Sequence, residues 1–244
     1  MKKLLTIFRS RYFRWSLLIA ILIVSVAACY GASRAWSMRT RFSRIGVWMA
    51  EPAAQPGWLV KGGERCGEAP MLFPSSSFIG VRWNDGLAPL YQHSGFDIFS
   101  PDGADNVTPI YAAYDGFLTR ESQWRSAVIV RHPDFEPLPD LVGGEQIWTY
   151  YTHLASRDGT ESFIEPDFPP GTREVFVEAG TLLGYQGSWS GSPTRDLSRH
   201  LHFSVVKSGP TGAYTNETQI SNTLDPAPFL GVTANAADIL VCAE

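Results

Sequence analysis

The pattern of hydrophobic and polar residues divides the chain into an apolar N-terminal run and a longer body of short strand-like runs. Residues 16–28 carry no charged side chain and are almost wholly apolar. From residue 78 onward, short runs rich in β-branched and aromatic side chains are separated by Gly, Pro and Asp, which is the pattern of strands and turns. These runs are residues 78–83, 110–113, 116–119, 127–131, 146–153, 174–177, 182–186 and 200–207.

The body lacks the amphipathic helical segments that alternate with strands in an α/β protein. We therefore predict a mainly β fold of antiparallel sheets, preceded by an N-terminal membrane-targeting helix. Asp115-Gly116 lies between two of the runs and is a hairpin-type turn signal. The length of 244 residues, with 44% hydrophobic and 18% charged residues, suits one globular domain behind a short leader.

The apolar run follows a basic stretch that contains no acidic residue. Its basic residues are Lys2, Lys3, Arg9, Arg11 and Arg14. A basic segment before a short apolar one is the pattern of an export signal, and extending the run over residues 15–32 gives 18 residues, the minimum for a membrane span. Under the positive-inside rule, either interpretation places the body outside the cytoplasm.

The three cysteines refine this interpretation. Residues 26–29 resemble a bacterial lipobox, in which Cys29 is lipidated; the alternative is a cysteine that lies in an anchor helix by chance. In an exported protein, Cys66 and Cys242 can pair, and this would leave Cys29 as the odd one. The alternative to the disulfide is two separate buried thiols.

The charge of the chain excludes one class of function. Without the five basic residues of the leader, 15 Lys and Arg face 24 Asp and Glu, so the remainder carries a net charge of about −9. Nucleic-acid binding needs a basic surface, so we expect no nucleic-acid partner. We also expect a monomer.

Four of the five histidines lie in three short motifs. In the first, His93 and Asp97 are suitable zinc ligands, and we expect Gly95 to allow a tight turn that brings them together. In the last, His200 and His202 are two residues apart on a predicted strand, so their side chains share one face. One can bind a metal while the other faces the substrate. Taken singly, each motif also fits ordinary hydrogen-bonded histidines.

The remaining two histidines differ in their surroundings. His153 follows a strand-like run, in Tyr150-Tyr151-Thr152-His153-Leu154, and alone would fit a hydrogen-bonded structural histidine. His132 has no partner motif, so we interpret it as structural.

As an ordered set, the motifs resemble the LytM/lysostaphin-type zinc metallopeptidases, a family of murein endopeptidases. That family has His-x-Gly-x-Asp, then a Tyr-x-His-Leu-like segment, then His-x-His on a strand. Residues 108–116, 180–188 and 225–230 also look like family segments, and the resemblance covers about residues 85–230. It implies an antiparallel β-sheet groove of the duplicated hybrid motif-like kind.

The resemblance also implies roles for the site residues. His93, Asp97 and His202 would hold one Zn²⁺, and His153 and His200 would be the catalytic histidines. The chain departs from the family at Ser204, where members often carry Glu, and in residues 190–199, which would reshape one groove wall. Residues 158–171, rich in Pro and acidic residues, look like another variable loop.

Together with the leader and the cysteines, these observations predict four parts of the chain. They are a signal, lipobox or anchor in residues 1–29, a tether and pre-domain segment in 30–75, the metallopeptidase domain in 76–232, and a tail in 233–244 that the pairing of Cys242 would link to Cys66.

The function implied by the resemblance is hydrolysis of cross-links or stem peptides of bacterial peptidoglycan, in cell-wall remodelling. Two alternatives stay open: a non-catalytic member that binds the wall or regulates another hydrolase, and an exported zinc peptidase with another peptide substrate. A structural zinc site fits poorly, since such sites are closed by four ligands and rich in Cys. If the upstream segment blocked the metal, the ligand would be a residue such as Glu51 or Glu64.

Overall fold

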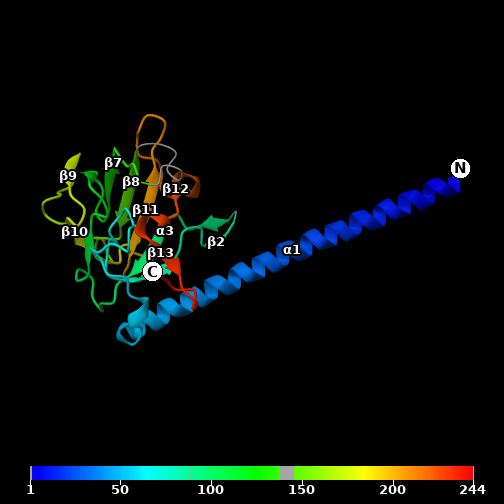
Figure 1. Ribbon diagram of the computed structural model, residues 1–244, viewed down its shortest axis with the longest axis horizontal. Helices are drawn as coiled ribbons and strands as arrows, with labels where there is room; N and C mark the ends of the chain where they lie inside the picture. The colour runs from blue at the N-terminus through cyan, green and yellow to red at the C-terminus, as the bar shows by residue number, and fades with distance from the viewer. Residues whose placement is uncertain (1, 89, 138–145, 244) are drawn as a thin grey trace.

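The computed structural model describes residues 2–88, 90–137 and 146–243, and consists of a β-rich body from which a long helix projects (Figure 1). The helical elements are α1 (Lys2–Ala50), η1 (Pro52–Ala54), η2 (Pro56–Trp58), η3 (Ile220–Asn222) and α3 (Ala227–Leu230). The strands are β1 (Phe78–Val81), β2 (Gly86–Leu87), β3 (Tyr91–Gln92), β4 (Phe96–Phe99), β5 (Pro109–Tyr111), β6 (Gly116–Thr119), β7 (Val128–His132), β8 (Ile147–Thr152), β9 (Val175–Val177), β10 (Leu182–Tyr185), β11 (Leu201–Lys207), β12 (Thr223–Leu224), β13 (Val232–Ala234) and β14 (Leu240–Cys242).

The strands form one large sheet and three small ones within the described ranges. The large sheet has eight strands in the order β1-β4-β11-β8-β7-β6-β9, with β12 paired to β11. The pairs β10-β5, β13-β14 and β2-β3 form the two-stranded sheets, and every pairing is antiparallel. The prediction of a mainly β, antiparallel fold is therefore confirmed.

Each predicted run corresponds to a strand, but six described strands lie outside these runs: the short strands β2, β3, β12, β13 and β14, and the sheet strand β4. The omission of β4 matters most for the site. This strand begins inside the His93–Asp97 motif, where a turn was expected. The hairpin expected at Asp115-Gly116 is also wrong, because β5 pairs with β10 whereas β6 pairs with β7 and β9. Donors from distant segments bind the two acceptors of Asp115. The Asp115 carboxylate accepts a hydrogen bond from the Ala179 N–H, and the Asp115 backbone carbonyl accepts one from the His132 ring.

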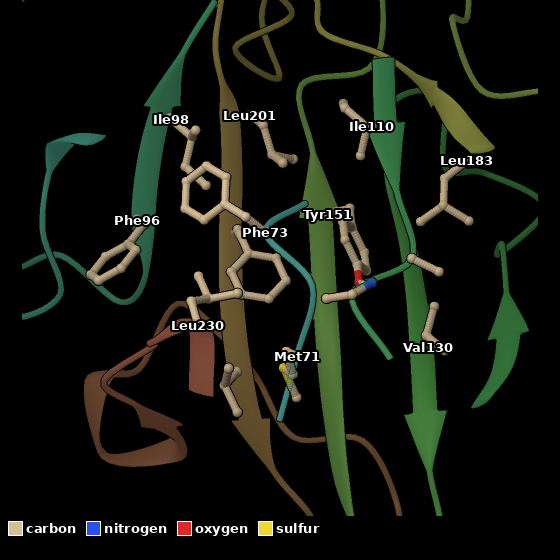
Figure 2. Close-up of a cluster of buried hydrophobic side chains, with 14 of the residues drawn as sticks. Met71, Phe73, Phe96, Ile98, Ile110, Val130, Tyr151, Leu183, Leu201 and Leu230 are labelled. Carbon is tan, nitrogen blue, oxygen red and sulfur yellow. Dashed lines mark hydrogen bonds between the residues drawn. The ribbon is translucent and has the colours of Figure 1, made fainter. Parts of the chain in front are cut away.

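The main core lies on one face of the large sheet. Alternate residues of β4, β11 and β8 point into it, and the segment before β1 and the β5-β10 sheet cover it (Figure 2). Among these core residues are Ile98, Leu201, Phe203, Tyr151, Phe73 and Ile110, each fully buried. Because side chains alternate along a strand, this arrangement leaves Asp97 and His202 on the opposite face.

Helix α1 combines an exposed apolar segment with a buried end. From Arg14 onward it is long and apolar enough to cross a membrane, and its apolar window is fully exposed. Near its C-terminal end, Ile45 and Trp48 are buried against Phe78 and Phe99. The helix stops at Ala50, ahead of Pro52, whose ring disfavours helical backbone in the preceding residue.

Residues 30–75, expected as a tether and pre-domain segment, pack against the body over much of their length. Residues 30–50 continue the helix, and Val60, Met71 and Phe73 belong to the main core. The division of the chain at residues 29, 75 and 232 stays a prediction.

The expected pairing of Cys66 with Cys242 is present as a disulfide between residues 176 apart in sequence. It ties the segment before β1 to the last strand. Cys29 is a free, exposed cysteine on α1, and its lipidation stays a prediction.

Candidate metal and catalytic site

Two of the expected metal ligands come from neighbouring strands. Asp97 on β4 and His202 on β11 are directly paired, so their side chains stand next to each other on the face that points away from the core. Gly95 allows β4 and β11 to approach each other closely, whereas the sequence predicted that it would allow a tight turn. A Cβ at Gly95 would lie 2.2 Å from the Phe203 carbonyl oxygen, so a larger residue would push β11 away.

The third expected ligand, His93, comes from the segment between β3 and β4. Its ring is buried, and its Nδ1–H donates to the Arg82 carbonyl at 3.1 Å. A carbonyl only accepts hydrogen bonds, so in the neutral ring the proton lies on Nδ1 and the lone pair on Nε2, which faces the site. On His202 the outer nitrogen, Nε2, contacts the Ser204 hydroxyl at 2.9 Å, which leaves Nδ1 for the site.

These three side chains converge on one point. His93 Nε2 lies 3.0 Å from Asp97 Oδ1 and 3.1 Å from His202 Nδ1, and the latter two atoms are 2.9 Å apart. Ligands at ordinary zinc distances and tetrahedral angles lie about 3.3 Å from one another. Two imidazoles and one carboxylate at this spacing form a donor set of the type that holds zinc in proteins, with one ligand atom offered by each residue.

The other two site histidines lie beside this cluster. His153 follows β8 and His200 precedes β11, and their ring centroids are 4.6 Å apart. Each donates its Nδ1–H to a backbone carbonyl: His153 to Trp189 at 2.7 Å and His200 to Ser198 at 2.6 Å. Their Nε2 atoms are therefore the nitrogens available to a substrate, and that of His200 lies 3.4 Å from Asp97.

The backbone and packing of these two histidines restrict their orientation. His153 has a φ of +79°, a left-handed conformation that residues other than glycine seldom adopt. The ring of His200 stacks on Phe99 of β4, with ring centroids 5.0 Å apart. Both imidazoles are thus held in place by contacts outside the site.

The charges of the cluster are strongly coupled. Burial raises the pKa of Asp97, but His93 and His200 nearby, with bonds from His200 and His202, hold it well below its usual range. Burial lowers the pKa of His93, yet the Asp97 carboxylate outweighs this, so the net shift is upward. Burial and neighbouring imidazoles lower the pKa of His153 well below its usual value. Without a metal, the site is an ionised carboxylate surrounded by imidazoles.

The site opens into a cavity of about 340 Å³. Sequence reasoning missed several residues that line it: Tyr91, Tyr150, Thr152, Arg195, Leu197 and Glu217. For Tyr150 a signal existed, because alternate residues of a strand face opposite ways. Its neighbour Tyr151, which belongs to the quoted motif, is instead a core residue whose hydroxyl accepts a bond from the Ala113 N–H.

Of the two variable segments, the stretch 190–199 reaches the cavity, whereas no residue of 158–171 is among those that line it. Ser190, Arg195 and Leu197, from the stretch before His200, line it. Neither Glu51 nor Glu64 is among its lining residues; Glu64 instead pairs with Lys61 on the surface.

His132, expected to be structural, lies outside the cluster. It is buried on β7, donates from Nδ1 to the Asp115 carbonyl at 2.7 Å and contacts the Thr149 hydroxyl through Nε2 at 2.9 Å. Burial lowers the pKa of His132 to about 4, so the ring is neutral at pH 7.

Comparison with known proteins gives structural neighbours only. No protein-family model and no curated protein matches the sequence. Among solved structures, the chain is similar to the catalytic domain of the antimicrobial peptidase lysostaphin from Staphylococcus simulans, with 21% identity and a TM-score of 0.40 over 63% of this chain and 92% of that one.

Two further neighbours are longer proteins. Csd3 of Helicobacter pylori shares 18% identity, with a TM-score of 0.39 over 66% of this chain and 34% of that one. A zinc containing peptidase from Vibrio cholerae shares 16% identity, with a TM-score of 0.35 over 61% of this chain and 35% of that one. The chain thus matches about a third of the length of each. Identities and TM-scores this low leave the argument for a function to the side chains of the site.

Proposed function

We propose that the protein is a zinc-dependent endopeptidase that hydrolyses peptide cross-links or stem peptides of bacterial peptidoglycan. The observation that carries the proposal is the convergence of His93 Nε2, Asp97 Oδ1 and His202 Nδ1 beside two further imidazoles on one cavity. The ordered resemblance of the three motifs to LytM/lysostaphin-type peptidases supports the substrate class.

In this proposal, His93, Asp97 and His202 hold the metal. Zinc bound there would supply a Lewis acid that polarises the scissile carbonyl and makes water a stronger nucleophile. The tautomers of the ligands suit this role, because the outer nitrogen of each imidazole bonds to Arg82 or Ser204 and the inner one faces the site.

His153 and His200 are the proposed acid–base residues. Their Nδ1 protons are committed to backbone carbonyls, so in the neutral form of each ring the lone pair lies on Nε2, where it can accept a proton from water. Once protonated, the same nitrogen can donate to the developing oxyanion or to the leaving amine. The two rings are in contact, so a peptide in the cavity meets both.

The proposed location is the outer side of a membrane, with α1 as an anchor or a lipidated leader. Arg34, Arg39, Arg41 and Arg44 follow the apolar run and would weaken the charge asymmetry on which this orientation depends. In the structure, three of them contact acceptors of the body: Arg34 the Gly86 carbonyl, Arg41 the Asp85 carboxylate and Arg44 the Ala237 carbonyl. We therefore assign the charge of these three to the folded body and propose that Lys and Arg before the run set the orientation.

The test is zinc content together with digestion of purified peptidoglycan by the full-length protein in detergent micelles. We expect about one zinc per chain and new peptide termini, read by mass spectrometry, that are absent with His202→Ala and present with His132→Gln. The sequence of the new termini names the bond.

Other outcomes separate the alternatives. Bound zinc with undigested wall, but cleavage of other peptides, would favour an exported peptidase with a different substrate. Wall binding that persists in His202→Ala, without any cleavage by the wild type, would favour a non-catalytic wall-binding protein. Absence of zinc from the wild type would overturn the proposal.

A further inference from the structure

The last turns of α1 lie on β4, which carries Asp97, and on β1, which pairs with β4. Trp48 is buried, and its Nε1–H donates to the carbonyls of Phe99 at 3.0 Å and Ser100 at 3.2 Å, at the end of β4. Ile45 packs so closely on β1 that a Cβ at Gly80 would lie 2.6 Å from it. In Figure 1 this end of the helix lies against the body while the N-terminal end extends far from it.

Two arginines of α1 bind the turn between β1 and β2, residues 82–86. Arg34 donates to the carbonyls of Asn84 and Gly86, the latter at 3.3 Å. Arg41 forms an ion pair with the carboxylate of Asp85, and the two side chains are only 17% and 9% exposed. A largely buried pair of this kind loses its stability when one partner is removed, because the other charge is left unpaired.

The same turn holds His93 through three hydrogen bonds. The Arg82 carbonyl accepts from His93 Nδ1, the Asp85 carbonyl accepts from the His93 N–H at 2.7 Å, and the Asn84 N–H donates to the His93 carbonyl at 2.7 Å. The second carboxylate oxygen of Asp85 accepts from the Arg82 N–H at 2.8 Å. The carboxylate of Asp85 therefore links Arg41 on α1 to the carbonyl that orients His93.

We propose that Arg41 is a positioning residue of the metal site, which acts through Asp85 and the 82–86 turn on the ring of His93. The inference rests on the proposed function, because it assigns Arg41 a role in the binding of the same metal. Without the guanidinium, the Asp85 carboxylate turns toward water, and the Arg82 carbonyl moves away from His93 Nδ1. Since α1 is continuous, the candidate membrane span and this contact belong to one helix.

The experiment measures metal affinity in the full-length protein in micelles, stripped of metal and titrated with Zn²⁺ in competition with a chromophoric chelator. Outer-shell partners of metal ligands typically contribute 10–100-fold in affinity, so we expect Arg41→Met to weaken Zn²⁺ binding by about that factor. The visible spectrum of Co²⁺ at the site should change as well, because His93 reorients. Arg41→Lys, which keeps the charge, should restore most of the affinity.

Arg39→Met is the matched control. Arg39 lies on the same helix two residues before Arg41, is exposed, and forms no hydrogen bond or ion pair with the described residues of the 82–86 turn. It should leave the affinity and the Co²⁺ spectrum unchanged. In an Asp85→Asn background, Arg41→Met should add little, because both act through one contact. Asp85→Asn also serves as the probe if Arg41→Met does not fold.

The outcomes distinguish the inference from the function on which it rests. Equal affinities of the wild type and Arg41→Met, or equal losses in Arg41→Met and Arg39→Met, would overturn the positioning role while wild-type zinc binding stands. Additive losses from Arg41→Met and Asp85→Asn would overturn the route through Asp85. A wild type that binds no Zn²⁺ would overturn the proposed function and this inference with it.

Discussion

Two regions of the large sheet bury histidines, and they differ in what meets the ring nitrogens. His132 on β7 has one protein partner for each nitrogen, the Asp115 carbonyl and the Thr149 hydroxyl. At the opposite end of β8, the inner nitrogens of His93 and His202 meet each other and Asp97, beside a cavity. Burial of a histidine therefore does not by itself indicate a catalytic or metal-binding role. Such a role is indicated when several ring nitrogens converge on one point that opens to solvent.

The difference follows from position along the strands. His132 pairs across from Ile147, at the end of β8 that is remote from the cavity. There its ring contacts Thr149 of β8 and the carbonyl of Asp115, the residue before β6. His202 pairs across from both Asp97 and Thr152, where β8 ends and the chain turns through His153. The following predictions test this contrast, from the largest expected effect to the smallest.

Asp97→Ala should have the largest effect, because this carboxylate contacts three imidazoles. We expect zinc affinity to fall by more than the roughly 10–100-fold typical of an outer-shell change, and hydrolysis to fall to background. The measurements are metal content by mass spectrometry and release of peptide from the wall. His132→Gln should retain both zinc and activity; a loss of zinc there would break the contrast.

His153→Ala and His200→Ala should separate chemistry from metal binding. Each should lower turnover by about 10²–10⁴-fold, as expected for the loss of an acid–base group, with zinc near one per chain. Turnover and metal content are measured on the same preparation. Loss of zinc in both variants would show that the ligands have been assigned wrongly.

His132 should control stability in acid. Burial lowers its folded-state pKa from about 6.5 to about 4, so the unfolded chain binds the proton more tightly than the folded one. Stability due to the neutral ring is therefore fully present above pH 6.5 and is lost as the pH falls toward 4, by about 3 kcal/mol. Chemical denaturation across this range should show a shallower pH slope in His132→Gln. Equal slopes would contradict the assignment.

Ser204→Ala should have the smallest effect. The Ser204 hydroxyl contacts His202 Nε2 at 2.9 Å, so its removal should weaken zinc binding by about tenfold, at the low end for an outer-shell partner. Ser188→Ala is a suitable control, because Ser188 is also buried but donates to Asp105. If both variants bind zinc like the wild type, Ser204 does not orient the ligand.

Local pattern was enough to predict much of the fold. Alternation and turn residues predicted eight strand runs, because a strand on a half-buried sheet has a period of two that local sequence records. β4 was missed, since its four residues overlap the metal-ligand motif and show no run of their own. The pairing of β5 with β10 instead of β6 depends on contacts between distant segments, and a turn signal carries no information on these.

The sequence by itself determined the residue types of the site, their order along the chain and the shared face of His200 and His202, because these are properties of short segments. Only the tertiary structure decided that Asp97 lies across from His202, that Gly95 is required by the approach of β11, and that α1 contacts the turn behind His93. Metal-site geometry depends on distances of a few ångströms between side chains from distant segments. Such distances are set by strand register and helix packing, which are long-range properties of the folded chain.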